Sequence, residues 1–228
     1  MKAYRKGGRF AAVAAVVVCM LLQAGCSRML CSMYQKSVLP EQGSIKVAGL
    51  NQTVDVRRDR LGIPFIEART KEDLFFATGY INAADRLNQM TGLKLISQGR
   101  LSEMAGEPTI EIDKYIRTLN LRKAAQMIYQ ELSSENRALL DRYCQGVNAY
   151  VDQHRDRLPP ELAMNRYTPE KWEPFDSMTI MAFVELALSF NAHEEIGGLA
   201  MAQKVGPEKA AWLLPIHPDE PIPFDEGR

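Results

Sequence analysis

The chain has 228 residues, of which 28 are Lys or Arg and 28 are Asp or Glu. This balance gives no basic surface of the kind that nucleic-acid-binding proteins present, so no nucleic-acid partner is expected. A hydrophobic content of 46% with 25% charged residues is typical of a globular protein and argues against a disordered body.

Residues 1–25 are predicted to be an export signal and not part of the fold. Basic residues precede an apolar run at 10–22, which is thirteen residues long. That length fits a signal-peptide core and falls short of the roughly 20 residues of a membrane-spanning helix. Segment 22–26 (LQAGC) is similar to a lipobox with Cys26 as the lipidated residue, although Gln23 stands where an aliphatic residue is usual. The alternative is ordinary cleavage near residues 24–25 and a soluble product. Both interpretations predict a periplasmic protein, and in the first a lipid anchor is its only membrane contact.

Residues 26–43 are predicted to be a polar tether, and the globular part is expected to span 44–228. Two short strands are predicted on either side of a turn at 59–62, one at Val54–Val56 and one at Ile63–Ile66. Another strand near Ile45–Val47 is expected to pair with the first of them.

A long helix is predicted after Thr70, which is placed to act as its N-cap with Asp73 as the capping-box partner. Apolar residues recur at helical spacing as far as Met90, and a second helical stretch continues towards a stop at Gly106. Glu107-Pro108 is expected to break it. Further helices are predicted at 121–132, from Ser133 or Ser134 to about Val151, from Asp176 or Ser177 to Leu188, and at 194–204.

Prolines mark two further boundaries. Residues 158–160 (LPP) are predicted to end the helix that begins at Ser133 or Ser134, and four prolines beyond residue 214 argue against regular structure there. The helix that ends at Leu188 is expected to carry one apolar face made of Ile180, Met181, Val184 and Leu188.

Two of the four cysteines remain for the folded chain, because Cys19 lies in the signal and Cys26 in the lipobox. Cys31 and Cys144 are able to pair in an oxidising compartment, but nothing in their spacing requires it. The alternative for Cys144, on a helix with Tyr143 and Val147, is a buried small hydrophobe.

The stretch 54–106 resembles the penicillin acylase family of N-terminal-nucleophile hydrolases, and the resemblance extends to the end of the chain. The matching pieces, in chain order, are RD at 58–59 with GIP at 62–64, DLFFATGY at 73–80, ADRLNQM at 84–90, GRLSEMAG at 99–106, Arg117, GVNAY at 146–150, and Pro169 with KWEPFDS at 171–177. It implies an α+β fold, namely the mainly helical alpha-chain portion of an αββα sandwich. A larger beta chain, cut from the same precursor, would complete the heterodimer. Unpaired strand edges and an exposed helix face are then expected in this chain alone.

The resemblance also implies that the nucleophile is the first residue of the beta chain, with its own alpha-amino group as the base. The mark of that junction, Gly-Ser followed by Asn and an aromatic residue, does not occur in this sequence. Gly43-Ser44 is followed by Ile-Lys and opens a predicted strand. We therefore assign no catalytic residue to this chain and expect it to be inactive alone. The three histidines, His154, His193 and His217, are interpreted as solvated or core residues.

Two candidate sites follow from the resemblance. Leu186 and Phe190, four residues apart on one helix face, match the helix end that lines the acyl pocket; the alternative is that both are core residues. Glu195 matches a glutamate that binds calcium together with beta-chain carboxylates, an ion suited to hard oxygen ligands. The residues after it, Gly197-Gly198, depart from the family pattern. The alternative for Glu195 is a helix N-terminal acid favoured by the helix dipole.

Five charged residues at matching positions are interpreted as structural and not chemical: Arg58, Asp59, Asp85, Arg86 and Arg100.

The function implied by the resemblance is hydrolysis of an amide between an acyl chain and an amine-bearing head group. Residues 92–106, 194–196 and 215–226 look closest to acyl-homoserine-lactone acylases, which act on quorum-sensing signals. A penicillin or beta-lactam acylase is one alternative, and a truncated, non-catalytic, lipid-tethered domain is another. A third is a lipoprotein binding module that uses the Leu186/Phe190 face without a nucleophile.

Overall fold

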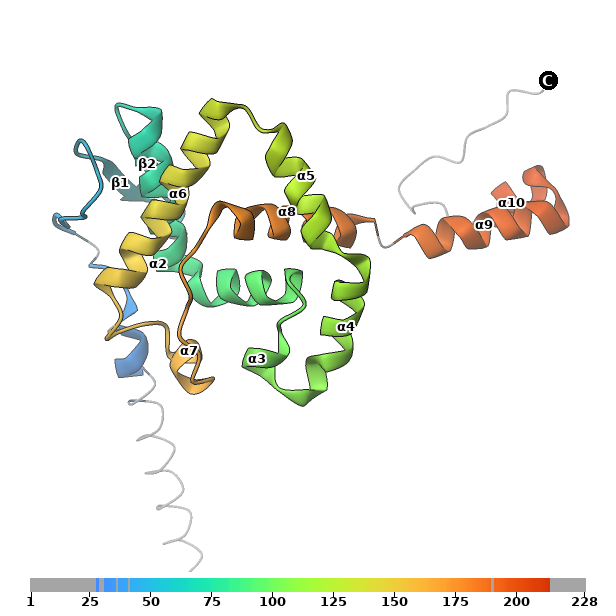
Figure 1. The fold of residues 1–228 in the computed structure, drawn as a ribbon, viewed down its shortest axis with the longest axis horizontal. Helices are drawn as coiled ribbons and strands as arrows, with labels where there is room; N and C mark the ends of the chain where they lie inside the picture. The colour runs from blue at the N-terminus through green and yellow to red at the C-terminus, as the bar shows by residue number, and fades with distance from the viewer. Residues whose placement is uncertain (1–27, 29–30, 36, 41, 190, 214–228) are drawn as a thin grey trace, which may run out of the picture. The chain divides into compact units, whose positions relative to one another are not determined.

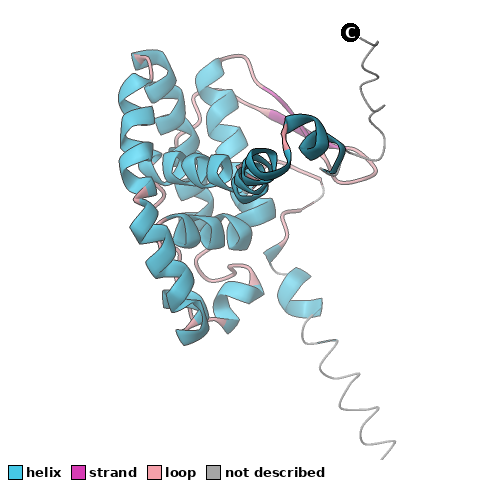
Figure 2. Cartoon of the chain, turned by 90° about the vertical axis from the view of Figure 1, so that its right-hand side faces the viewer, coloured by secondary structure: helices cyan, strands magenta, loops and turns pink. Residues whose placement is uncertain are grey.

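The computed structural model describes residues 28, 31–35, 37–40, 42–189 and 191–213. Contacts divide the chain after Ala182 into two compact units, and the second begins at Phe183. The described residues are mainly helical with one two-stranded sheet (Figures 1 and 2), which confirms the expected α+β class. No helix among them is long and apolar enough to cross a bilayer.

The predicted hairpin is present. Strands β1 (Asp55–Arg58) and β2 (Pro64–Glu67) pair antiparallel, with Val56 opposite Ile66. The side chain of Asp59 accepts hydrogen bonds from the backbone N–H groups of Leu61 and Ile63, both at 2.9 Å, and so closes the turn.

The additional strand predicted near Ile45–Val47 is wrong. Residues 45–47 belong to no strand, and β1 pairs only with β2 among the described residues. Instead, the carbonyl oxygen of Lys46 accepts a hydrogen bond of 2.8 Å from Nε2 of Gln153. A side chain from a helix thus satisfies this backbone where the prediction placed a strand.

Helix α2 (Lys71–Ser97) begins as predicted, because Oγ1 of Thr70 accepts a hydrogen bond from the N–H of Asp73 at 3.2 Å. The capping-box role of Asp73 is wrong. Its buried carboxylate accepts hydrogen bonds from the N–H groups of Asn51 and Gln52 at 3.0 and 3.1 Å. Asp73 therefore holds the preceding loop against the helix.

The predicted helix end near Met90 is also wrong, since α2 is 27 residues long and ends at Ser97. It is kinked at Arg86, whose backbone angles (φ −138°, ψ 19°) are not helical. Beyond the kink Thr91, Lys94 and Leu95 are buried, so tertiary packing maintains the helix after the local signal weakens. The short helix α3 (Ser102–Ala105) then stops at Gly106, as predicted.

Helix α6 (Ser134–Gln153) packs directly on α2 (Figure 1). Its N-cap is Ser133, whose Oγ accepts a hydrogen bond from the N–H of Asn136. The expected buried face is present and provides much of the core around Val147 and Tyr150. A Cβ on Gly79 would collide with the carbonyl oxygen of Tyr143, and a Cβ on Gly146 with that of Phe76. The two helices therefore touch through their backbones.

The remaining elements are η1 (Glu107–Thr109), α4 (Ile110–Leu119), α5 (Leu121–Glu131), α7 (Pro160–Met164), α8 (Pro174–Leu188), α9 (Ala192–Val205) and α10 (Pro207–Leu213). The sequence predicts α5, α8 and α9, and it does not indicate η1, α4, α7 or α10. Pro160, Pro174 and Pro207 each begin a helix, because proline suits the first helical turn, where its missing N–H is not needed.

Most of the predicted apolar face of α8 is exposed: Ile180 is partly buried against the core, whereas Met181, Val184 and Leu188 are 45%, 43% and 80% exposed. The buried residues of α8 are Asp176, Met178, Thr179 and Ala182. Because α8 is apolar on nearly all sides, sequence spacing did not distinguish the side that packs from the side that does not.

Part of the predicted tether lies against the first unit. Residues 31–35 are helical, and Oη of Tyr34 donates a hydrogen bond of 2.8 Å to Glu161. Oη of Tyr150 donates to the carbonyl oxygen of Ser37, whose side chain is buried. The predicted signal with Cys26, and the proline-rich end, lie outside the described residues.

Candidate functional site

The residues predicted to form the acyl pocket are only partly described. Leu186 lies on the last turn of α8 and is half-buried. Phe190 lies outside the described residues. Both assignments therefore remain predictions.

Glu195 lies in the first turn of α9 and is exposed. Its Oε1 accepts a hydrogen bond of 2.8 Å from Nδ2 of Asn191. Calcium requires six to eight oxygen ligands, and no group of three His, Cys, Asp or Glu residues able to hold a metal occurs within the described ranges. The chemistry of Glu195 suits the ion, and its assignment as a calcium ligand stays a prediction.

His154 and Cys144, which could in principle act as base and nucleophile, are engaged in packing. His154 is buried, its Nδ1 lies 2.9 Å from the carbonyl oxygen of Tyr150, and its ring stacks on the Tyr150 ring at 4.3 Å. It is thus a core histidine, as predicted; the side chain of His193 and all of His217 lie outside the described residues. Cys144 is a buried free thiol, and burial raises its pKa to about 12. Cys31 is also unpaired and is exposed.

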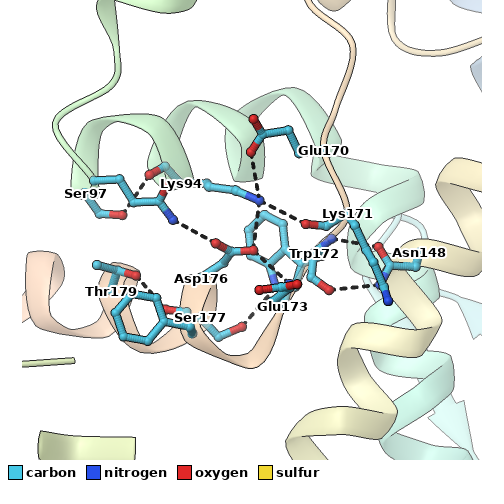
Figure 3. Close-up of polar contacts among 12 residues, drawn as sticks. Lys94, Ser97, Asn148, Glu170, Lys171, Trp172, Glu173, Asp176, Ser177 and Thr179 are labelled. Atoms are coloured by element: carbon cyan, nitrogen blue, oxygen red, sulfur yellow. Dashed lines mark hydrogen bonds and ion pairs between the residues drawn. The ribbon is translucent and has the colours of Figure 1, made fainter. Parts of the chain in front are cut away.

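A buried ion pair joins α2 to the start of α8 (Figure 3). Nζ of Lys94 lies 2.9 Å from Oδ2 of Asp176 and donates a second hydrogen bond, of 3.0 Å, to the carbonyl oxygen of Lys171. Both side chains of the pair are 7% exposed. Asp176 also accepts hydrogen bonds from Nε2 of Gln98 and from the N–H of Glu173, at 2.7 and 2.8 Å. The prediction that the helix begins at Asp176 or Ser177 is wrong, since α8 begins at Pro174 and Asp176 lies in its first turn. Asp176 is instead the centre of a tertiary network.

The same network fixes Trp172 (Figure 3). Asn148 of α6 accepts a hydrogen bond from the N–H of Trp172 and donates one to its carbonyl oxygen, at 2.8 and 2.9 Å. The indole Nε1 donates to Oγ of Ser177 at 3.0 Å, and Nζ of Lys94 lies 5.8 Å from the ring centre. The 171–177 segment is thus a strap that connects α2, α6 and α8.

The charged residues interpreted as structural have that role where their contacts are described. Arg58 forms a two-pronged pair with Asp85, at 2.7 and 2.9 Å. Arg100 binds both Glu103 and Glu170, and hydrogen bonding from Arg100 lowers the pKa of Glu170 below its usual value. Arg86 is exposed at the kink of α2.

Sequence reasoning missed a groove in the first unit between α5, α6 and the strap. Its volume is about 430 Å³, and aromatic side chains at Tyr129, Trp172 and Phe175 line it beside Cys144. The guanidinium of Arg122 lies 5.0 Å from the Phe175 ring centre. These residues come from separate parts of the chain, so no local motif indicates the groove.

The sequence is similar to one protein family and to several of its members. The sequence model of the penicillin amidase family matches residues 53–222. The acyl-homoserine lactone acylase QuiP of Pseudomonas aeruginosa is 47% identical over 204 residues, which cover 90% of this chain and 24% of that protein. QuiP of Pseudomonas syringae pv. tomato is 44% identical over 96% of this chain and 26% of its own length. The penicillin G acylase of Escherichia coli is 32% identical over 65% of this chain and 18% of its own.

A solved structure supports the same relationship. The thermostable penicillin G acylase of Alcaligenes faecalis is 29% identical with a TM-score of 0.56, over 72% of this chain and 89% of the matched chain. The chain spans about a quarter of the length of the QuiP relatives that it matches. The family match over residues 53–222 and the identity to these acylases show that the chain belongs to the penicillin amidase family.

Proposed function

We propose that this chain is the alpha-subunit region of an exported amide hydrolase that removes an acyl chain from an amine-bearing head group. The observation that carries the proposal is the 47% identity to an acyl-homoserine lactone acylase over 90% of the chain. On this ground an N-acyl-homoserine lactone is the proposed substrate, and the biological role is quorum quenching.

The proposed partner is a beta chain from the same precursor. The curated relatives are about four times as long as the segment that they share with this chain. In the Alcaligenes faecalis structure, by contrast, the match covers 89% of one chain, which is therefore a short separate polypeptide. One relative is named as a proenzyme, the penicillin acylase 2 of Pseudomonas sp.. Together these facts support a region that is synthesised within a precursor and works as one subunit.

The two chains are proposed to contribute different groups to the active site. A serine hydroxyl needs a neighbouring base to become nucleophilic near neutral pH, and an alpha-amino group, with a pKa of about 8, is a suitable one. Such a group would be the first residue of the beta chain. The proposed contributions of this chain are the acyl-pocket residues Leu186 and Phe190 and the calcium ligand Glu195, with the ion shared with beta-chain carboxylates. Export to the periplasm and lipidation of Cys26 complete the proposal.

The experiment is co-expression of the chain with its companion polypeptide, followed by mass spectrometry of the products from N-acyl-homoserine lactones. We expect release of homoserine lactone and free fatty acid by the pair and none by this chain alone. Hydrolysis of penicillin G in place of the lactone would favour the beta-lactam acylase alternative, which the Escherichia coli relative supports. If an assembled pair cleaves neither substrate, the acylase proposal is wrong.

A further inference from the structure

Helix α4 (Ile110–Leu119) is held to its own unit by two of its charged residues, Asp113 and Arg117. The carboxylate of Asp113 is 5% exposed and accepts hydrogen bonds from the N–H groups of Leu101 and Ser102, at 2.7 and 2.9 Å. Nε of Arg117 donates to the carbonyl oxygen of Gly99 at 2.7 Å. Only one apolar residue of the helix, Ile116, is buried with them. These bonds fix the rotation of α4 about its axis.

The apolar side of α4 consequently faces outwards. Ile112, Tyr115 and Leu119 are 42%, 53% and 39% exposed. They are spaced i, i+3 and i+7, so they form one stripe along the helix. An amphipathic helix on the surface of a complete protein normally buries such a stripe and exposes its charges. On α4 the stripe is exposed, whereas the carboxylate of Asp113 is buried.

We propose that the stripe Ile112, Tyr115 and Leu119 is a docking surface for the companion beta chain, which would cover it with an apolar face. This inference rests on the proposed function and adds the surface by which the partner binds. The relatives contain about three quarters of their length outside the matched segment, so a large polypeptide is available to cover the helix. The charges beside the stripe neutralise each other, since Lys114 pairs with Glu111 at 2.7 Å. A neutral, apolar partner surface therefore suits it better than a charged one.

The test compares two triple variants of the full chain. The stripe variant, I112K/Y115K/L119K, places charges on exposed positions of the docking surface. The control variant, E111Q/K114Q/T118Q, changes three exposed polar residues elsewhere on the same helix. Because all six side chains are exposed, both variants should retain the Tm of the unaltered chain by circular dichroism.

Association with the companion beta chain is then measured by surface plasmon resonance. We expect the stripe variant to bind at least tenfold more weakly and the control to bind as the unaltered chain does. Hydrogen exchange of residues 110–119 should slow on addition of the companion. Equal binding by the stripe variant, or no slowing of exchange, would overturn the inference. So would self-association of the free chain that the stripe variant abolishes without effect on companion binding, because a second copy would then be the occupant.

The same samples separate this inference from the proposed function. If the pair assembles through the stripe but cleaves no amide, the docking surface stands and the acylase proposal fails. If the stripe variant assembles and cleaves normally, the acylase proposal stands and the docking surface fails.

Discussion

Lys94 illustrates how a single side chain decides the geometry of the first unit. Its ammonium group is enclosed by protein and balanced by the carboxylate of Asp176 and the carbonyl oxygen of Lys171. A buried ion pair contributes little net stability compared with an apolar pair of the same shape, but loss of one partner leaves a charge without compensation. The pair therefore acts mainly to specify one arrangement of α2, the strap and α8.

Replacement of Lys94 by methionine should destabilise the chain by about 3–5 kcal/mol, because the carboxylate of Asp176 would remain buried without a cation. The measurement is urea unfolding followed by circular dichroism. The double variant K94M/D176L should be more stable than K94M, since it removes both charges. K71M is the matched control, because its pair with Glu135 is exposed (71% and 65%) and its loss should change little. A K94M variant as stable as K71M would contradict this role.

Asp113 predicts a dependence of stability on pH. Burial by itself raises the pKa of Asp113, but hydrogen bonds from Ser102 and Leu101 and the charge of Arg117 outweigh it, so the pKa lies below its usual value. The group therefore stabilises the folded state above the unfolded pKa of about 4, and this contribution is lost as the pH falls through the folded pKa. D113N should consequently reduce the free energy of unfolding more at pH 7 than at pH 3. An equal reduction at both pH values would exclude the carboxylate charge as the cause.

At the scale of the elements, the contact between α2 and α6 depends on two glycines. A methyl group at Gly79 or Gly146 would collide with a backbone carbonyl of the opposite helix, which has no flexible end to move aside. G79A and G146A should each destabilise the chain by at least about 2 kcal/mol, although alanine favours a helix, because the two helices must separate. Thermal unfolding measures the effect. G197A in α9 is the control, since a Cβ there meets nothing within 4 Å and should be tolerated.

The sequence predicts an element well when its local pattern and its tertiary packing agree. Helix α6 is an example: Ser133 caps it, and the apolar spacing of Val147 and Tyr150 marks the face that packs on α2. Helix α4 fails this condition, since its apolar stripe faces outwards and a Glu-Pro break precedes it. The sequence does not indicate helix α7, because a proline can end one helix or begin the next, and Pro160 is the first residue of α7.

Local sequence patterns could not predict the polar network around Lys94 and Trp172, because its members are far apart in the chain. Lys94 and Asp176 are 82 positions apart, and Asn148 meets Trp172 across 24. Only the folded arrangement of α2, α6 and α8 brings these groups together. The family resemblance did indicate residues 171–177 as a unit, but not what the segment binds.

For the whole molecule, large apolar residues are exposed on more than one element of the first unit. Besides the stripe on α4, the hairpin exposes Leu61, Ile63 and Phe65, at 75%, 59% and 63%. A sheet of two strands is marginal alone, and β1 and β2 have no further strand partner in the described ranges. These features agree with the expectation of unpaired edges in an isolated alpha-chain region.

The proposed role of Leu186 makes a prediction that only the assembled molecule can test. Its position on the last turn of α8 and its half-buried side chain suit a residue that forms the wall of an acyl pocket. A larger indole at this position should shorten the space for the acyl chain. For the co-expressed pair, L186W should lower kcat/KM for long-chain substrates at least tenfold relative to short-chain ones, since each methylene that loses its place is worth roughly tenfold or more. L186M conserves volume and should keep the preference of the unaltered pair. If L186W instead lowered kcat/KM equally for every chain length, the residue would act through the stability of α8 and not through contact with the acyl chain.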